Sequence, residues 1–132
     1  MSVRDSVITW SDILEPETIE NDLSGYLSHM PPDEQGRTIH NYLEENYGDI
    51  EGTTWEEEIE YEDGVCRYDC YDGKFVYEFK TKNDHRMTEE YLPVEEDLLQ
   101  IQTYLEATDS EHGVLVYISR QSFDIKEYLV YR

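Results

Sequence analysis

The pattern of apolar and polar positions predicts two helices near the N-terminus, after a short apolar stretch at 7–10. From Pro16 to the proline pair at 31–32, apolar side chains recur at the three- and four-residue spacing of one buried helix face. Residues 36–47 repeat this spacing and stop at Gly48, so we expect a second helix there. The N-terminal third of the chain is therefore expected to be helical.

The middle of the chain alternates at the two-residue period of β-strands. Residues 53–62 predict a first strand with a very acidic outer face, and a turn at 63–64 leads into a hairpin. Asp72-Gly73 lies between two β-prone runs, and Asp-Gly is a strong signal for a two-residue hairpin loop. That loop predicts a register in which Asp69 faces Val76. Three consecutive antiparallel strands are therefore expected.

Alternation divides the side chains of the predicted hairpin between two faces. One face is expected to join the core and carries Cys66, Tyr68, Cys70, Phe75, Tyr77 and Phe79. The other face carries Asp69, Glu78 and Lys80, with Asp69 and Glu78 as diagonal neighbours about 7–8 Å apart. Two carboxylates at that separation can share a divalent cation. The alternative is a solvated strand face on which Arg67 pairs with Glu78.

The C-terminal half predicts one more helix and two more strands. Residues 81–93 form a polar loop, and a helix with an acidic first turn begins at Pro93. Residues 114–118 form a continuous apolar run, typical of a strand buried on both faces, and 123–131 alternate as a last strand. We therefore expect one α/β domain over residues 1–132, with a mixed sheet and the element order ααβββαββ.

The net charge of the chain is strongly negative and bears on the solvent or partner to which the protein is adapted. It has 32 acidic and only 10 basic residues, a formal net charge of −22. Regular apolar patterning and 13% aromatic residues argue against disorder. Two interpretations remain: the surface of a halophilic protein, or a DNA mimic that presents carboxylates to a nucleic-acid-binding enzyme. Because the acids are scattered along the chain, the first interpretation is favoured.

The cysteines and the hydropathy pattern bear on the compartment. Cys66 and Cys70 on one strand would lie about 13 Å apart, whereas a disulfide needs Cα atoms within about 7 Å. We therefore expect reduced cysteines. No apolar run approaches the roughly 20 residues of a membrane span, and no signal peptide is visible. These features predict a cytoplasmic protein, from a halophilic archaeon or a virus that infects one, with no membrane partner.

The predicted hairpin carries a recognisable motif. Asp69, followed on the next strand by Glu78-Phe79-Lys80, resembles the acid and Glu-x-Lys signature of the PD-(D/E)xK nuclease superfamily. The expected order of elements is similar to the restriction-endonuclease-like αβββαβ core of that superfamily, with an extra N-terminal helix and a C-terminal strand. The resemblance implies a mixed α/β fold and hydrolysis of phosphodiester bonds.

Two further motifs resemble the RecB-like branch of this superfamily. Gly36 and His40 on the second helix are similar to the glycine-then-histidine helix of that branch, in which the histidine binds metal. Gln100 and Tyr104 on the third helix resemble its Q-x-x-x-Y motif. Taken from the residues alone, His40 fits a surface histidine, and Gln100 and Tyr104 fit an ordinary amphipathic helix.

The resemblance implies a set of site residues and a cofactor. Mg²⁺ or Mn²⁺ would be held by His40, Asp69, Glu78 and the carbonyl of Phe79, and Lys80 would orient water or stabilise the transition state. Gln100 and Tyr104 would shape the site and hold the end of the DNA. The branch includes CRISPR-associated exonucleases that bind an iron–sulfur cluster through four cysteines. This chain has two cysteines, so we expect no such cluster.

The sequence therefore predicts a metal-dependent DNA nuclease, an exonuclease by resemblance, with single- or double-stranded DNA as its partner. The alternative is a non-catalytic acidic binding protein, such as a DNA mimic or nuclease inhibitor. Four basic residues in one short window argue against a mimic, which would gain nothing from them: Lys74, Lys80, Lys82 and Arg86.

Overall fold

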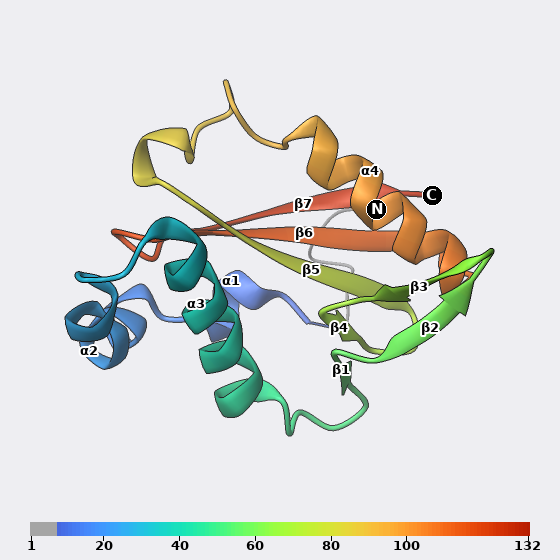
Figure 1. Cartoon of the computed structure of the whole chain (residues 1–132), viewed down its shortest axis with the longest axis horizontal. Coiled ribbons are helices and arrows are strands. Elements are labelled where there is room, and N and C mark those ends of the chain that lie inside the picture. The colour runs from blue at the N-terminus through green and yellow to red at the C-terminus, as the bar shows by residue number, and fades with distance from the viewer. Residues whose placement is uncertain (1–7) are drawn as a thin grey trace.

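The computed structural model describes residues 8–132, so Val7 of the short apolar stretch lies outside the described part (Figure 1). A five-stranded mixed sheet forms the centre, in the order β1-β4-β5-β6-β7. Strands β5 and β6 are parallel and the other neighbours are antiparallel. The strands are β1 (Thr54–Trp55), β4 (Cys70–Tyr71), β5 (Phe75–Lys82), β6 (His112–Ser119) and β7 (Ile125–Tyr131).

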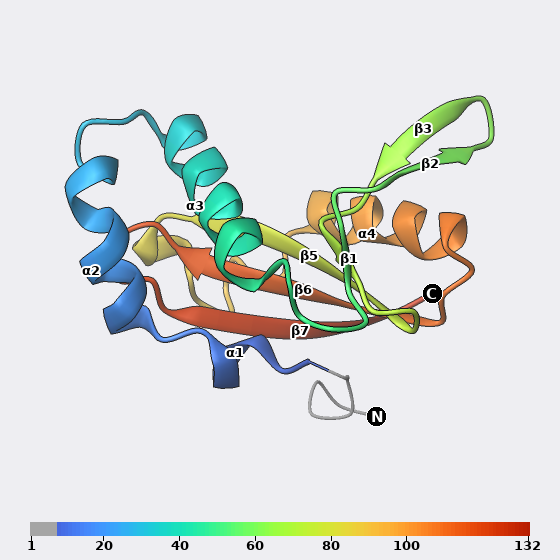
Figure 2. The same cartoon turned by 90° about the horizontal axis from the view of Figure 1, so that it is seen from below.

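Helices cover both faces of this sheet (Figures 1 and 2). The helices α1 (Trp10–Ile13), α2 (Pro16–Leu27) and α3 (Pro32–Tyr47) lie on one face, and α4 (Glu95–Ala107) lies on the other. Helix α3 begins at Pro32 rather than at the predicted residue 36. Proline is well suited to the first turn of a helix, because the N–H that it lacks has no partner there in any case.

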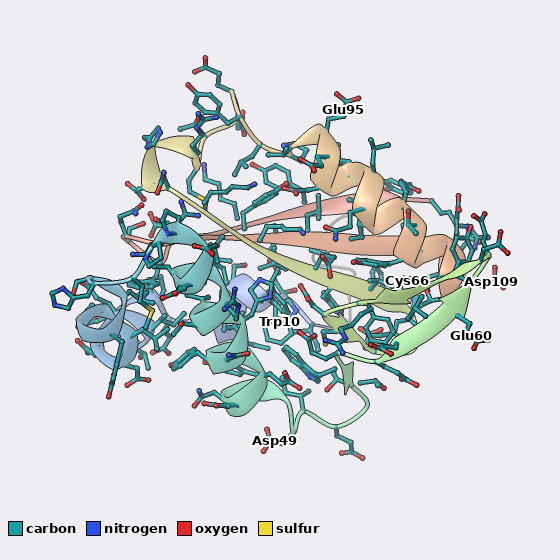
Figure 3. All side chains as sticks on the ribbon, in the orientation of Figure 1. Trp10, Asp49, Glu60, Cys66, Glu95 and Asp109 are labelled. Atoms are coloured by element: carbon teal, nitrogen blue, oxygen red, sulfur yellow. The ribbon has the colours of Figure 1, made fainter. Side chains whose placement is uncertain are left out.

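Two apolar cores follow from this three-layer arrangement. The alternate strand residues Phe75, Tyr77 and Phe79 pack with α1, α2 and α3 around the fully buried Trp10, which Figure 3 shows in the interior. On the opposite face, Val76 packs with α4, β6 and β7. Strand β6 contributes to both cores, which confirms the prediction of a strand buried on both faces.

The predicted register of the central hairpin is wrong by two residues. Tyr71 pairs with Val76, not with Lys74. The reason lies in the turn, where Oδ1 of Asp72 accepts the N–H groups of Lys74 and Phe75, and Gly73 has a φ of +89°. These bonds close a longer loop than a two-residue turn. A shift of two residues preserves alternation, so Asp69 and Glu78 remain on one face and now lie opposite each other instead of diagonally.

The predicted first strand is also interrupted. Glu56 has a φ of +53°, and beyond it β2 (Glu58–Tyr61) and β3 (Gly64–Arg67) form a separate two-stranded ribbon that projects from the sheet in Figure 2. Tyr68 consequently packs in the core under α4, and Cys66 is only half-buried, so neither joins the face that Cys70 shares with β5. The prediction of one continuous core face is wrong there.

The predicted class of fold is confirmed. The connection β5–α4–β6 is a parallel crossover, preceded by helix and antiparallel strands, as in a restriction-endonuclease-like core with an added C-terminal strand. The predicted loop at 81–93 contains one short 3-10 helix, Asp84–Arg86. Among the described residues, no helix is both long and apolar enough to cross a membrane.

Candidate active site

Helix α3 brings His40 to the sheet because Gly36 allows a close approach. A Cβ at Gly36 would lie 2.9 Å from Oγ1 of Thr81 on β5, so a larger residue would require a shift of the helix or of the threonine side chain. His40 follows Gly36 by about one helical turn and therefore lies on the same side of α3. The glycine in the motif thus has a physical role, which is to hold the histidine against the central strands.

The two predicted carboxylates lie side by side at the junction of β4 and β5. The backbone N–H of Asp69 donates to Oε1 of Glu78 at 3.1 Å. Oδ2 of Asp69 accepts the N–H of Phe79 at 2.8 Å. The ring of Phe79 stacks on Trp55 in the core, so its backbone is fixed beside the carboxylates. The structure therefore brings together Asp69, Glu78 and Phe79 as the sequence predicted.

Glu78 is the most unusual of these groups electrostatically. Its side chain is buried, and burial raises its pKa well above the usual value, with the adjacent charge of Asp69 adding to the rise. Nζ of Lys80 lies 3.5 Å from Oε2 of Glu78 and acts in the opposite direction. A buried carboxyl next to a second carboxylate is stabilised as an anion only by added positive charge. This arrangement is suited to binding a cation.

Helix α4 adds the remaining predicted residues. Nζ of Lys80 donates to Oε1 of Gln100, and Nε2 of Gln100 donates to the hydroxyl of Tyr104 at 3.0 Å. Burial, followed by the charges of Glu78 and Asp69, raises the pKa of Tyr104 to about 12. A chain of contacts therefore runs from Tyr104 on α4 to the carboxylates between β4 and β5.

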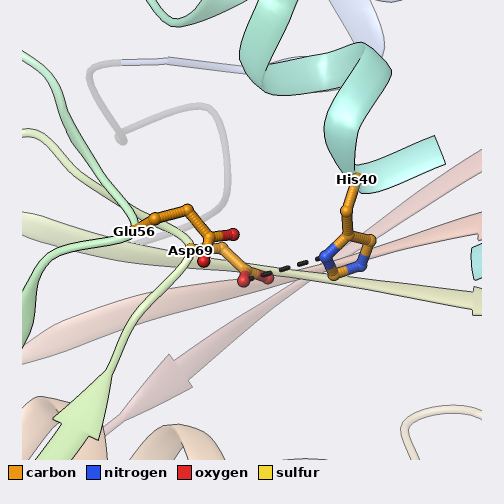
Figure 4. A group of neighbouring side chains, drawn as sticks. All are labelled: His40, Glu56 and Asp69. Carbon is orange, nitrogen blue, oxygen red and sulfur yellow. Dashed lines mark ion pairs between the residues drawn. The ribbon is translucent and has the colours of Figure 1, made fainter. Parts of the chain in front are cut away.

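The structure adds one candidate ligand that the sequence analysis missed. Ligand atoms of His40, Glu56 and Asp69 all lie within 4.8 Å of one another (Figure 4), and Nδ1 of His40 is 3.8 Å from Oδ1 of Asp69. Glu78 is not a member of this group of three. The N–H of Glu56 donates to the carbonyl of Asp69 at 3.1 Å, and burial, with Asp69 and Glu44 nearby, raises the pKa of Glu56.

Comparisons with solved structures place this arrangement in a known fold. No protein-family model and no curated protein sequence matches the chain. SSO0001 is similar with a TM-score of 0.58 and 24% identity over 89% of this chain and 61% of that one. An alkaline exonuclease (LHK-Exo) from Laribacter hongkongensis has a TM-score of 0.62 and 16% identity over 88% of this chain and 66% of that one.

A phage-related exonuclease from Haemophilus somnus 129PT is also similar, with a TM-score of 0.57 and 16% identity over 88% of this chain and 69% of that one. The chain has the restriction-endonuclease-like fold. These similarities support the predicted class of fold. The chain spans less than two thirds of the length of the first two of these proteins.

Asp72, the other acid of the central hairpin, stabilises the turn between β4 and β5. Oδ1 of Asp72 caps the turn, and Oδ2 of Asp72 accepts the hydroxyl of Tyr77 at 2.6 Å. This agrees with the prediction that Asp72 belongs to the turn.

The four basic residues of the window 74–86 do not all lie together in the structure. Lys74 lies over the Phe75 ring at the start of β5, and Lys82 is 3.4 Å from Asp97 at the other end of the strand. Arg86 lies over the ring of Tyr91. The basic window therefore does not form one cluster, although Lys80 and Lys82 lie on the same face of β5.

The cysteines lie outside the cluster of candidate ligands. Cys66 and Cys70 are both free, and the Cys70 thiol is completely buried, which raises its pKa and disfavours the thiolate that binds metals. Cys66 is half-buried on β3.

Proposed function

We propose that this chain is a metal-dependent deoxyribonuclease that hydrolyses phosphodiester bonds, acting as an exonuclease. The observation that carries the proposal is the pair of the buried Glu78 and the half-buried Asp69, joined to Lys80 and faced by His40. A buried acid beside a second carboxylate is costly for a fold unless positive charge is added, as a bound cation would do. Support also comes from the fold, because two of the similar structures are named exonucleases.

The donor set fits a hard divalent cation. His40, Asp69 and Glu78 would hold Mg²⁺ or Mn²⁺ with the carbonyl of Phe79, and Glu56 is a further carboxylate within reach of His40 and Asp69. Carboxylate and carbonyl oxygens suit both ions, and one imidazole is compatible with Mn²⁺. When bound, such an ion neutralises charge at the phosphate and lowers the pKa of a bound water.

The remaining side chains position the reacting groups. The amide of Gln100 accepts from Nζ of Lys80 and thereby directs this cation along the same face as Glu78. With a pKa of about 12, Tyr104 keeps its proton at neutral pH and can donate a hydrogen bond to a phosphate oxygen. In the reaction, water forms a bond to phosphorus and gives up a proton, the bond to the leaving oxygen breaks, and that oxygen takes up a proton in exchange.

The test is cleavage of labelled single- and double-stranded DNA by the purified chain, with and without Mn²⁺, alongside calorimetric titration of Mn²⁺. Asp69→Asn and Glu78→Ala should lose both cleavage and Mn²⁺ affinity. Lys80→Ala should lose turnover but bind Mn²⁺ nearly normally, because lysine is not a ligand. Asp72→Asn is the matched control and should keep both, since Asn also suits the turn.

Wild-type cleavage rates in Glu78→Ala and Lys80→Ala would refute the assigned site. A wild-type protein that never cleaves DNA but inhibits a DNA-binding enzyme would support the alternative, a DNA mimic or nuclease inhibitor. A loss in Asp72→Asn as large as that in Asp69→Asn would show that the turn residue belongs to the site.

A further inference from the structure

A cleft of about 770 Å³ leads to the candidate metal ligands. One wall is the exposed side of α3 from Pro32 to Glu44, and the floor includes Thr81 at the end of β5. His40 and Glu56, two of the three clustered ligands, lie on its lining. A molecule that fills this cleft would therefore touch the candidate active site.

Arginines from three separate segments line this cleft. Arg37 comes from α3, Arg67 from the end of β3, and Arg120 from the turn after β6. They are three of only ten basic residues in a chain with 32 acids. Segments that are distant in sequence thus bring scarce positive charge to one place, and we call it the arginine cleft.

Two of these arginines are not neutralised. Within residues 8–132, neither Arg37 nor Arg120 has a carboxylate at ion-pair distance, whereas Arg67 lies 3.1 Å from Glu58. The side chain of Arg37 is exposed on α3 and free to reach a ligand. The cleft lining also contains the carboxylates of Asp33, Glu44 and Glu56, but among the described residues none of them lies at ion-pair distance from Arg37 or Arg120, so both guanidinium groups are available to an anion.

Arg120 is held rigidly without losing its charge. Its terminal nitrogens donate to the carbonyl of Thr81 at 3.1 Å and to Oδ1 of Asn83 at 2.7 Å, both of them neutral acceptors. Its Nε is buried and has no hydrogen-bond partner among the described residues. Burial lowers the pKa of Arg120, so the charged form is maintained at a cost that a bound anion would offset.

We propose that the arginine cleft binds the backbone phosphates of one polynucleotide strand and leads that strand to the His40–Glu56–Asp69 cluster. The inference rests on the proposed function and adds the residues that hold its substrate. Guanidinium groups match the planar geometry of phosphate oxygens and bind them by charge-assisted hydrogen bonds. Phosphate contacts fix position without reading sequence, so binding through Arg37 and Arg120 is independent of base sequence.

The experiment measures binding rather than cleavage, by fluorescence anisotropy of a labelled single-stranded oligonucleotide with Mn²⁺. The full chain carries Lys80→Ala so that the strand stays intact. Adding Arg37→Gln or Arg120→Gln should weaken binding about tenfold each, as expected for a lost charged hydrogen bond. Arg86→Gln removes the same charge outside the cleft and should change binding less than about twofold.

Salt dependence separates a phosphate contact from a general charge effect. Each phosphate contact adds about −0.7 to the slope of log K against log salt for a single strand. Repulsion by the other carboxylates is common to all variants, so the difference between slopes reports the lost arginine contact. Arg37→Gln should thus have a slope about 0.7 less negative than its parent, and Arg86→Gln should not differ.

Equal binding by the Arg37→Gln, Arg86→Gln and parent proteins would overturn the inference. If Arg120→Gln lowers the melting temperature, Arg120→Lys replaces it as the test variant, because lysine keeps the charge but not the planar guanidinium group. Competition by inorganic phosphate as strong as by the oligonucleotide would also overturn it, because the cleft would then hold an isolated anion. Arginine-dependent binding in a protein that never cleaves would refute the proposed function and leave the cleft assignment standing.

Discussion

The close contact between Gly36 and Thr81 makes a quantitative test of how α3 positions the site. In Gly36→Ala, the new Cβ would lie 2.9 Å from Oγ1 of Thr81, whereas ordinary contact begins near 3.4 Å. We expect the helix and the strand to separate by about 0.5 Å to relieve this contact. His40, about one turn further along α3, moves with the helix.

The expected effects differ for stability and for activity. Alanine gains about 1 kcal/mol of helix propensity over glycine, and overpacking removes about 1–3 kcal/mol, so Gly36→Ala should lose about 0–2 kcal/mol. A misplacement of about 1 Å can lower a rate about 100-fold, so a shift of half that size should lower cleavage about tenfold. Thermal unfolding and initial rates with Mn²⁺ measure the two effects.

Gly25 on α2 is the matched control. A Cβ at Gly25 meets nothing within 4 Å, so Gly25→Ala should raise stability by about 0.5–1 kcal/mol and leave cleavage unchanged. Thr81→Ala combined with Gly36→Ala removes the clashing oxygen and should restore most of the lost activity. A Gly36→Ala protein that is stabilised as much as Gly25→Ala and cleaves at the wild-type rate would contradict the proposed role of Gly36.

Three further predictions test the electrostatics and the metal content. First, because the pKa of Glu78 is raised in the fold, the metal-free protein loses stability as pH rises from the unfolded-state pKa through the folded-state pKa of this group. Unfolding in EDTA should therefore show that Glu78→Gln is more stable than wild type, by a margin that grows with pH. A margin that stays constant with pH would contradict this prediction. Second, folding stability and cleavage should both increase from 0.1 M toward molar KCl. The electrostatic screening length falls from about 10 Å to about 3 Å over this range, so the repulsion between DNA and the distant acids is screened. An optimum of cleavage at low salt would rule out a halophilic adaptation. Third, anaerobically purified protein should contain no stoichiometric iron and sulfide, and a brown preparation that contains both would show that Cys66 and Cys70 take part in a cluster.

Periodicity predicted most of the fold because each element is consistent with its local sequence. The helix periodicity of α2, α3 and α4 and the apolar run of β6 were sufficient to place these elements. Alternation also put Asp69 and Glu78 on one face, and this survived an error of two residues in the register because side-chain parity was unchanged. The outcome shows that face assignment is more robust than exact pairing.

Glu56 could not be found from the sequence, because it lies among consecutive glutamates on what reads as the solvated face of one strand. Its left-handed backbone ends β1, and the bond from its N–H to the Asp69 carbonyl turns its side chain toward His40. Neither property has a periodic signal. The charged neighbours of this glutamate, Arg67, Asp69 and His40, are at least 11 positions away in the sequence.

Most of the helices and strands, the class of fold and the residue types available for chemistry could be predicted from the sequence, since these depend on propensity and on the periods of helix and strand. The sequence could not predict that Lys80 contacts Gln100, that Lys74 and Lys82 lie at opposite ends of β5 with different partners, or that Arg37 and Arg120 line one cleft. These contacts could not be predicted from the sequence because a charge acts through space over a few ångströms. Which charges come within that range depends on how α3, α4 and the strand ends pack, and local sequence carries no record of those distances.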